Sequence, residues 1–263
     1  MSQTKESSEF EAKMNPMSSI KNVIGVMSGK GGVGKSTISV LIAKQLKREG
    51  HEVGILDADI TGPSIPRLLG IEDQKAIYED PYIRPVKTYD GIKAISLNLL
   101  IEDENQPVIW RGPLLAGAVK QFWSDVNWGT LDYLIIDLPP GTGDVALTAM
   151  QSLPITGLVI VSIPQDLVSM IVSKAVNMAR KMDTKVLGVV ENMSYIRCPD
   201  CETKIQIFDN NDCSEFLEEM DLKLLGELPM IKSINKLHES NYEEIEPHVK
   251  PIIDKVLEEL KVI

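Results

Sequence analysis

The stretch GKGGVGKS, residues 29–36, decides the fold of this chain. A short apolar run, residues 22–29, leads into it, and residues 35–50 carry apolar side chains at helical spacing. Glycines let the backbone N–H groups of such a loop turn inward on an anion, and the start of the helix adds a favourable dipole. A strand, this loop and a helix in that order therefore predict a binding site for the phosphates of a nucleotide.

The residues of the loop have separate predicted roles. Lys35 is expected to reach the β- and γ-phosphates, and the hydroxyl of Ser36 is expected to bind Mg²⁺. The other loop residues predicted to surround the nucleotide are Gly29, Lys30, Gly31, Gly32, Val33, Gly34 and Thr37. A glycine-rich turn with a chance Lys-Ser pair is the alternative, and the flanking strand and helix patterns argue against it.

Carboxylates at the ends of two further apolar strands complete the predicted site. Asp137 ends one strand, where a carboxylate can hold Mg²⁺ through water, and the glycines after it allow the next segment to move with the γ-phosphate. Asp57 and Asp59 follow another strand, where they can orient the attacking water or the shell of the metal. Asp59 is the predicted water-positioning residue, although either of these two carboxylates could instead cap a turn.

Apolar runs and helical patterns alternate along the rest of the chain. The further predicted strands are residues 51–59, 92–100, 131–141, 157–165, 185–193 and 222–230, and the further helices are residues 112–126, 167–182 and 246–260. Continuous apolar strands separated by helices are typical of a parallel sheet covered on both faces. The predicted fold class is α/β, a P-loop NTPase with a mostly parallel central sheet flanked by helices on both faces.

Composition limits the location and the partners. The chain has 263 residues, and 27 Lys plus Arg against 38 Asp plus Glu give a net charge of -11. That charge repels polyanions, so nucleic acid and anionic membranes are not expected partners. Three cysteines, no signal sequence and no apolar run of spanning length favour a reducing, cytoplasmic location.

The two ends of the chain differ in character. Residues 1–20 are polar and lack either period, so a disordered leader is expected, with a single domain over residues 21–263. The C-terminal helical pattern, residues 246–260, has an apolar face like that of a membrane-targeting helix. Its opposite face is acidic instead of basic, which favours packing against the domain.

Cys198 and Cys201 form a C-x-x-C pair. Soft thiolates bind iron–sulfur clusters or zinc, and the residue types alone do not decide between them. A closed site usually needs four ligands, and Cys213 is the only other thiol, so a two-fold dimer is needed to bring two pairs together. A thioredoxin-like redox pair is disfavoured because residues 202–208 alternate like a strand, and a buried structural pair is disfavoured by the charged neighbours.

Five segments together resemble the Mrp/ApbC family of P-loop ATPases that carry iron–sulfur clusters. They are SGKGGVGKS, LDADITGPS, DYLIIDLPPGTGD, VSIPQ and VENMSYIRCPDC, and they occur in the family's order between about Lys21 and about Met230. That family belongs to the deviant Walker A group, with the nitrogenase iron protein and the division-site ATPase MinD.

The resemblance implies roles for single residues. Lys30 corresponds to the signature lysine, which reaches across a dimer interface to the partner's nucleotide. Asn192 corresponds to a residue that recognises the adenine base, and Pro164 with Gln165 lies in a loop near the nucleotide. Asp137 corresponds to the Walker B carboxylate.

For the whole chain, the resemblance implies an ATP-hydrolysing homodimer that holds one [4Fe-4S] cluster between the C-x-x-C pairs of two subunits and transfers it to apo-proteins. Lys30, Lys35 and Asp59 are then the residues expected to act in ATP hydrolysis, and the cysteine pair lies in a loop inserted into the domain. The chain departs from the family at Glu202, where glycine is common, and in the FDNND segment, residues 208–212.

Three other functions compete with this one. A MinD- or ParA-like positioning ATPase shares the loop and Lys30 but needs no cysteine pair. A zinc-stapled dimeric ATPase would use the same four thiolates. A metabolic ATP-dependent ligase would need a substrate pocket that the sequence does not indicate.

Overall fold

The computed structural model describes residues 12–59, 62, 64–101, 112–167, 170–198, 200–201, 203–207, 214–231, 234, 237 and 242–262. Cys213, Glu202 and residues 208–212, which the sequence singled out, lie outside these ranges. The side chains of residues 112–116, 166, 167 and 214 are likewise outside the description.

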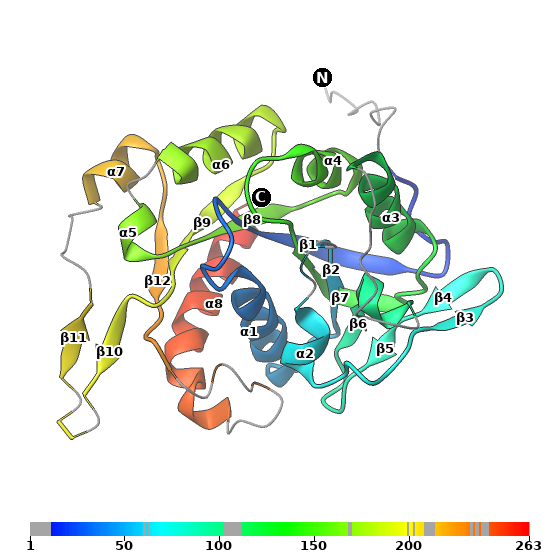
Figure 1. The fold of residues 1–263 in the computed structure, drawn as a ribbon, viewed down its shortest axis with the longest axis horizontal. Helices are drawn as coiled ribbons and strands as arrows, with labels where there is room; N and C mark the ends of the chain where they lie inside the picture. The colour runs from blue at the N-terminus through cyan, green and yellow to red at the C-terminus, as the bar shows by residue number, and fades with distance from the viewer. Residues whose placement is uncertain are drawn as a thin grey trace.

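An eight-stranded sheet in the order β12-β9-β8-β1-β7-β2-β6-β5 forms the centre of the molecule (Figure 1). Its strands are β1 (Ser19–Ser28), β2 (Val53–Asp57), β5 (Val86–Lys87), β6 (Lys93–Ile95), β7 (Thr130–Asp137), β8 (Gly157–Ser162), β9 (Val186–Glu191) and β12 (Leu224–Glu227). Among the described pairings of this sheet, β5 with β6 is antiparallel and the others are parallel. The mostly parallel sheet predicted from the sequence is confirmed.

Helices cover both faces of the sheet. They are α1 (Lys35–Arg48), α2 (Ile65–Leu69), α3 (Gly112–Ser124), α4 (Asp144–Ser152), α5 (Pro164–Leu167), α6 (Met170–Lys181), α7 (Ser214–Glu219) and α8 (Glu246–Lys261). In Figure 1, α1 and α8 lie together on one side of the sheet, and α3, α4 and α6 lie on the other. None of the described helices combines the length and apolar character needed to span a bilayer.

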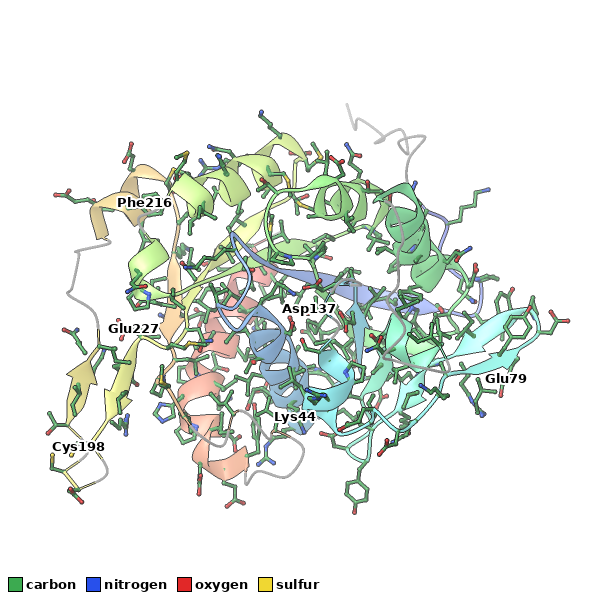
Figure 2. All side chains as sticks on the ribbon, viewed as in Figure 1. Lys44, Glu79, Asp137, Cys198, Phe216 and Glu227 are labelled. Carbon is green, nitrogen blue, oxygen red and sulfur yellow. The ribbon has the colours of Figure 1, made fainter. Side chains whose placement is uncertain are left out.

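Two short hairpins extend from opposite ends of this body (Figure 1). One consists of β3 (Ile77–Glu79) and β4 (Tyr82–Arg84). The other, which we call the cysteine hairpin, consists of β10 (Tyr195–Arg197), β11 (Lys204–Gln206) and the turn between them. Figure 2 shows Cys198 at the outer end of the cysteine hairpin, while Asp137 lies in the middle of the molecule.

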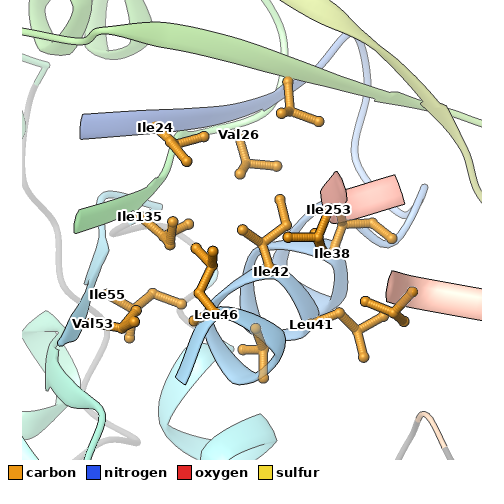
Figure 3. Close-up of a cluster of buried hydrophobic side chains, with 14 of the residues drawn as sticks. Ile24, Val26, Ile38, Leu41, Ile42, Leu46, Val53, Ile55, Ile135 and Ile253 are labelled. Atoms are coloured by element: carbon orange, nitrogen blue, oxygen red, sulfur yellow. The ribbon is translucent and has the colours of Figure 1, made fainter. Parts of the chain in front are cut away.

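The side chains of β1 divide between two cores because successive residues of a strand face opposite sides of the sheet. Ile24 and Val26 pack with Ile38 and Ile42 of α1 (Figure 3), and Ile253 of α8 joins the same cluster. Val23 and Met27 pack on the other side, against Val119, Phe122 and Trp123 of α3 and Ala149 and Met150 of α4. Burial on both faces is what makes the strands continuously apolar.

The C-terminal helix α8 packs against the rest of the domain. Val249, Ile252, Ile253 and Val256 of α8 are buried in the core that α1 shares. The Tyr242 hydroxyl, just before α8, donates to the side chain of Gln45 in α1 at 3.2 Å. The prediction that this helix packs against the domain is confirmed.

The structure differs from the sequence-based expectation at two boundaries. Residues 92–100 were expected to form one strand, but β6 ends at Ile95 and a 3₁₀ helix, η1 (Leu97–Leu99), follows. The neighbouring strand β2 pairs Leu56 with Ile95 and ends one residue later, so a longer strand has no neighbour to pair with. At the other boundary, β1 begins at Ser19, inside the expected leader, and Trp123 Nε1 donates to the Ala12 carbonyl at 3.1 Å.

Candidate nucleotide site and cysteine hairpin

The glycine-rich loop connects the carboxyl end of β1 to the start of α1. Gly32 and Gly34 have left-handed backbones, with φ of 82° and 85°. A Cβ at Gly34 would lie only 2.2 Å from Asn192 Nδ2, so this position needs glycine for space as well as for conformation. Asn192 Nδ2 donates to the carbonyl of the adjacent Val33 at 2.9 Å.

A buried charge cluster lies beneath this loop. Lys35 Nζ is 2.8 Å from Asp137 Oδ1 and 3.6 Å from Asp59 Oδ2, and both Lys35 and Asp137 are buried. The Ser36 hydroxyl donates to Asp137 Oδ2 at 2.6 Å. The structure therefore brings together the four residues predicted from separate segments to act on phosphate, metal and water.

Ser39 extends the cluster in a way that the sequence reasoning missed. Its hydroxyl donates to Asp137 Oδ1 at 2.7 Å, so both oxygens of this carboxylate are held by serines of α1. Ser39 lies three residues after Ser36, and residues at that spacing share a helix face. That spacing is the signal that could have found it.

Asp57 occupies a different environment from Asp59. The Ser96 hydroxyl donates to Asp57 Oδ2 at 3.1 Å, and the backbone N–H of Asp59 donates to its Oδ1 at 3.1 Å. Burial and the neighbouring charge of Asp137 raise the pKa of Asp57 to about 8. Asp59 lines the open cavity beside the loop, whereas Asp57 lies behind it.

Two cavities adjoin the loop. The first has a volume of about 320 Å³, and its lining includes Gly31, Gly32, Gly34, Lys35, Ser36, Asp59 and Arg67. The second, of about 450 Å³, is largely apolar and is lined by Thr37, Asn192, Met193, Ile196, Pro229, Met230, Ile231 and Ile234. Thr37 borders both cavities, so they are adjacent.

Four residues singled out by the family resemblance lie in different places. Asn192 lines the second cavity, with its amide held by the loop carbonyl. Lys30 is in the loop, where its carbonyl accepts a hydrogen bond of 2.9 Å from the Ser28 hydroxyl. Pro164 begins α5 beside the exposed Gln165, and neither of these two residues lines either cavity.

The cysteine hairpin places two thiols at its tip. Tyr195 pairs with Gln206 and Arg197 with Lys204, and the Cys198 N–H donates to the Thr203 carbonyl at 3.0 Å to close the turn. Cys201 is exposed and Cys198 is partly exposed, and both thiols are free. The alternative of a buried structural pair is wrong for these two cysteines.

Thr203 also acts on the Cys201 thiol. The side chains are 3.1 Å apart, and hydrogen bonds from the Thr203 hydroxyl, the Thr203 N–H and the Cys198 thiol lower the pKa of Cys201. The thiolate is the form that binds metals and clusters, so this environment favours a ligand. Across the described ranges, no group of three or more His, Cys, Asp or Glu side chains is placed to hold a metal ion.

Sheet, loop and carboxylate together define the class of the protein. The sheet is mostly parallel, the GKGGVGKS loop follows its β1 strand, and a carboxylate ends the neighbouring strand β7. These three features define a P-loop NTPase. Residues 19–261 match the family model described as NUBPL iron-transfer P-loop NTPase, and the chain belongs to that family.

Two relatives illustrate the extent of the match. An iron-sulfur cluster carrier protein of Clostridium perfringens is 49% identical over 262 residues, which cover 97% of this chain and 92% of that one. The iron-sulfur cluster transfer protein NUBPL of Mus musculus is 42% identical over 226 residues, covering 85% and 70% of the two chains.

Solved structures agree with the fold. A nucleotide-binding protein of Archaeoglobus fulgidus, in complex with ADP, superimposes with a TM-score of 0.77 at 44% identity and covers 88% of this chain and 91% of that one. The septum site-determining protein MinD of Pyrococcus horikoshii, complexed with Mg-ADP, gives a TM-score of 0.63 at 20% identity, covering 90% and 95%. The second likeness concerns the fold alone.

Proposed function

We propose that this chain is an ATP-hydrolysing iron–sulfur cluster carrier that works as a homodimer in the cytoplasm. Its cargo is one [4Fe-4S] cluster, held between the cysteine hairpins of two subunits and transferred to apo-proteins. The observation that carries the proposal is the position of Cys198 and Cys201, two free thiols at the outer end of a hairpin that projects from a P-loop NTPase. Relatives named as cluster carrier and cluster transfer proteins support it.

The ligand count requires the second subunit. A [4Fe-4S] cluster takes four thiolates, and each hairpin offers two. A two-fold axis near the tip of the hairpin would supply the other pair. A cargo held at an exposed, shared position can be reached by an acceptor protein, which suits transfer better than storage.

Apolar side chains on the cysteine hairpin also fit a second copy. Ile205 of β11 and Ile207 directly after it are 49% and 38% exposed, although their size and apolar character favour burial. The net charge of -11 makes nucleic acid or an anionic membrane an unsuitable partner for this face. In such a dimer, Lys30 is the residue that would extend to the partner's nucleotide.

The first cavity fits the phosphates of ATP. Its loop glycines present backbone N–H groups, and the ADP complex of the Archaeoglobus fulgidus relative supports a nucleotide here. Ser36, Asp137 and Asp59 offer the oxygen ligands that Mg²⁺ prefers, and the ion when bound would neutralise charge on the phosphates. Lys35 would then exchange its carboxylate partners for phosphate oxygens, and Asp59 would orient the attacking water.

The second cavity fits the adenine base. It is largely apolar, it adjoins the phosphate cavity at Thr37, and the Asn192 amide lies in its wall. Ile196 of β10 is in the same wall, two residues before Cys198. A bound base would therefore touch the strand that leads to the cluster ligands, which gives the nucleotide a direct route to alter how tightly the thiolates hold their cargo.

Anaerobic reconstitution with iron and sulfide tests the proposal. The wild-type chain is expected to gain about four irons per dimer, with thiolate-to-iron absorbance, and to activate an apo-enzyme that needs such a cluster. Cys198→Ser with Cys201→Ser should abolish iron binding, whereas Cys213→Ser is the matched control and should retain it. ATP hydrolysis is measured in the same preparations as phosphate release.

The other outcomes separate the competing functions. A double variant that still binds iron and activates the apo-enzyme would exclude the bridging cluster. Zinc in place of iron, lost with the same two cysteines, would indicate a zinc-stapled dimer. A colourless protein that dimerises with ATP and sediments with vesicles or DNA would indicate a positioning ATPase.

A further inference from the structure

Arg67 lines the phosphate cavity together with residues of the glycine-rich loop. It belongs to α2, which follows the Asp57–Asp59 segment, and it lines the same cavity as Lys35 and Asp59. Its side chain is exposed, and no carboxylate or carbonyl oxygen of the described residues accepts a hydrogen bond from its guanidinium. A guanidinium that has no acceptor among the described residues, and that lines the same cavity as the glycine-rich loop, is available to bind an anionic ligand.

The backbone under Arg67 is firmly placed. Ile65, Pro66 and Leu69 of the same helix are buried, and Gly70 ends the helix with a left-handed φ of 67°. The N–H groups of Gly70 and Ile71 donate to the carbonyls of Arg67 and Pro66, at 3.2 and 2.9 Å. The helix therefore holds the backbone of Arg67 beside the cavity.

The charges around the phosphate cavity favour a second cationic side chain beside Lys35. The ammonium of Lys35 already faces two carboxylates, those of Asp137 and Asp59. A polyphosphate entering this cavity thus meets more negative than positive charge within the protein. The guanidinium of Arg67 reduces that excess, and its planar fork can bind two phosphate oxygens at once.

We infer that Arg67 is a phosphate-contacting residue of the nucleotide site, supplied by the same subunit that supplies the loop. It binds the phosphates farthest from the ribose, since it lines the cavity with Gly31, Asp59 and Pro140 and is absent from the wall of the base cavity. The inference rests on the proposed nucleotide function. Arg67 would contact the nucleotide of its own subunit, whereas Lys30 would contact the nucleotide of the partner subunit.

The test compares the affinities of Arg67→Gln, Arg67→Lys and wild-type protein for AMP, ADP and ATP with Mg²⁺. A charge-assisted contact of this kind corresponds to a loss of about 10- to 100-fold in ATP affinity for Arg67→Gln. The loss should decrease from ATP to ADP to AMP, because the shorter nucleotides lack the phosphates that Arg67 binds. Arg67→Lys should recover part of the affinity, since it restores the charge without the fork.

Arg84→Gln is the matched control. Arg84 is also an exposed arginine, but it lies on the β3–β4 hairpin and pairs with Glu79 at 3.0 Å. The Arg84→Gln variant should have the same affinities for AMP, ADP and ATP as the wild-type protein. Unchanged affinities for Arg67→Gln, or an equal loss for all three nucleotides, would overturn the inference and leave the proposed function intact. A wild-type chain that binds none of the nucleotides would overturn both.

Discussion

Asn192 Nδ2 donates a hydrogen bond of 2.9 Å to the carbonyl oxygen of Val33, which ties the end of β9 to the glycine-rich loop. The same segment continues through Met193, whose backbone is left-handed with φ of 54°, into β10 and then to Cys198. A few consecutive residues thus connect the glycine-rich loop to the root of the cysteine hairpin, and we propose that they couple the two sites.

Asn192→Ala should weaken nucleotide binding because it removes this hydrogen bond and leaves the buried Val33 carbonyl without its partner. We expect a loss of about 1–3 kcal/mol in binding or in the free energy of unfolding. ATP should also lose its effect on cluster release, measured as iron transferred to a chelator with and without ATP. The control is Asn98→Ala, which changes an asparagine of η1 outside both cavity walls. A normal ATP effect in the Asn192 variant would contradict the transmission route.

Gly34→Ala should abolish nucleotide binding and destabilise the fold. A left-handed alanine costs about 1–2 kcal/mol, and its Cβ would in addition contact Asn192 Nδ2 at 2.2 Å. Gly50→Ala separates the two effects, because Gly50 has φ of 91° and a Cβ there meets nothing within 4 Å. Urea unfolding should show a similar loss from strain in both variants and a further loss in Gly34→Ala. Equal losses, with nucleotide binding retained in both variants, would exclude the predicted clash.

Thr203→Val should raise the pKa of the Cys201 thiol. The Thr203 hydroxyl is the largest cause that lowers this pKa, and valine keeps the size while removing the hydrogen bond. A lowered pKa means that the thiolate forms at a lower pH than in an ordinary cysteine, so the variant should need a higher pH. The measurement is the rate of Cys201 alkylation against pH in a Cys198→Ala, Cys213→Ser background, where the hydrogen bonds that remain on the Cys201 thiol come from Thr203. An unchanged midpoint would show that the hydroxyl has no effect.

Ser39→Ala should weaken the Mg²⁺ dependence of nucleotide binding more than it weakens the fold. Asp137 Oδ1 would keep Lys35 but lose the Ser39 hydroxyl, so the carboxylate would be less firmly oriented. We expect a stability loss of about 1 kcal/mol and a higher Mg²⁺ concentration at half-maximal ATP binding. Ser28→Ala, which removes a hydrogen bond to the Lys30 carbonyl at the same end of the sheet, is the comparison. An identical Mg²⁺ titration in Ser39→Ala and wild type would exclude the positioning role.

The sequence predicts the sheet and the loop well because their signals are local. The GKGGVGKS segment lies between a strand and a helix in the chain itself, and the continuous apolar character of β1, β7 and β8 follows from helices on both faces. The strand expected over residues 92–100 ends at Ile95 instead, because β6 can extend only as far as the neighbouring strand β2 pairs with it. The sequence of residues 92–100 does not contain that information.

The parts of the site that were missed depend on contacts between distant segments. Arg67 reaches the phosphate cavity only because α2 folds back beside the loop, and Ser96 matters only because it meets Asp57. The contact between Asn192 and Val33 joins residues 159 positions apart, and no spacing in the sequence indicates it. Thr203, in contrast, lies two residues from Cys201, and a hydroxyl beside a C-x-x-C pair is a signal that could have been used.

The cysteine hairpin lies between β9 and β12, which are parallel neighbours in the sheet. Two parallel strands always need a long crossover connection to bring the chain back to the starting edge, and a two-residue turn cannot serve. The cysteine hairpin and α7 occupy that connection, so the thiols lie where the topology already requires extra chain. The length and content of this one crossover can therefore differ, with or without a cysteine pair, while every strand pairing of the sheet stays the same.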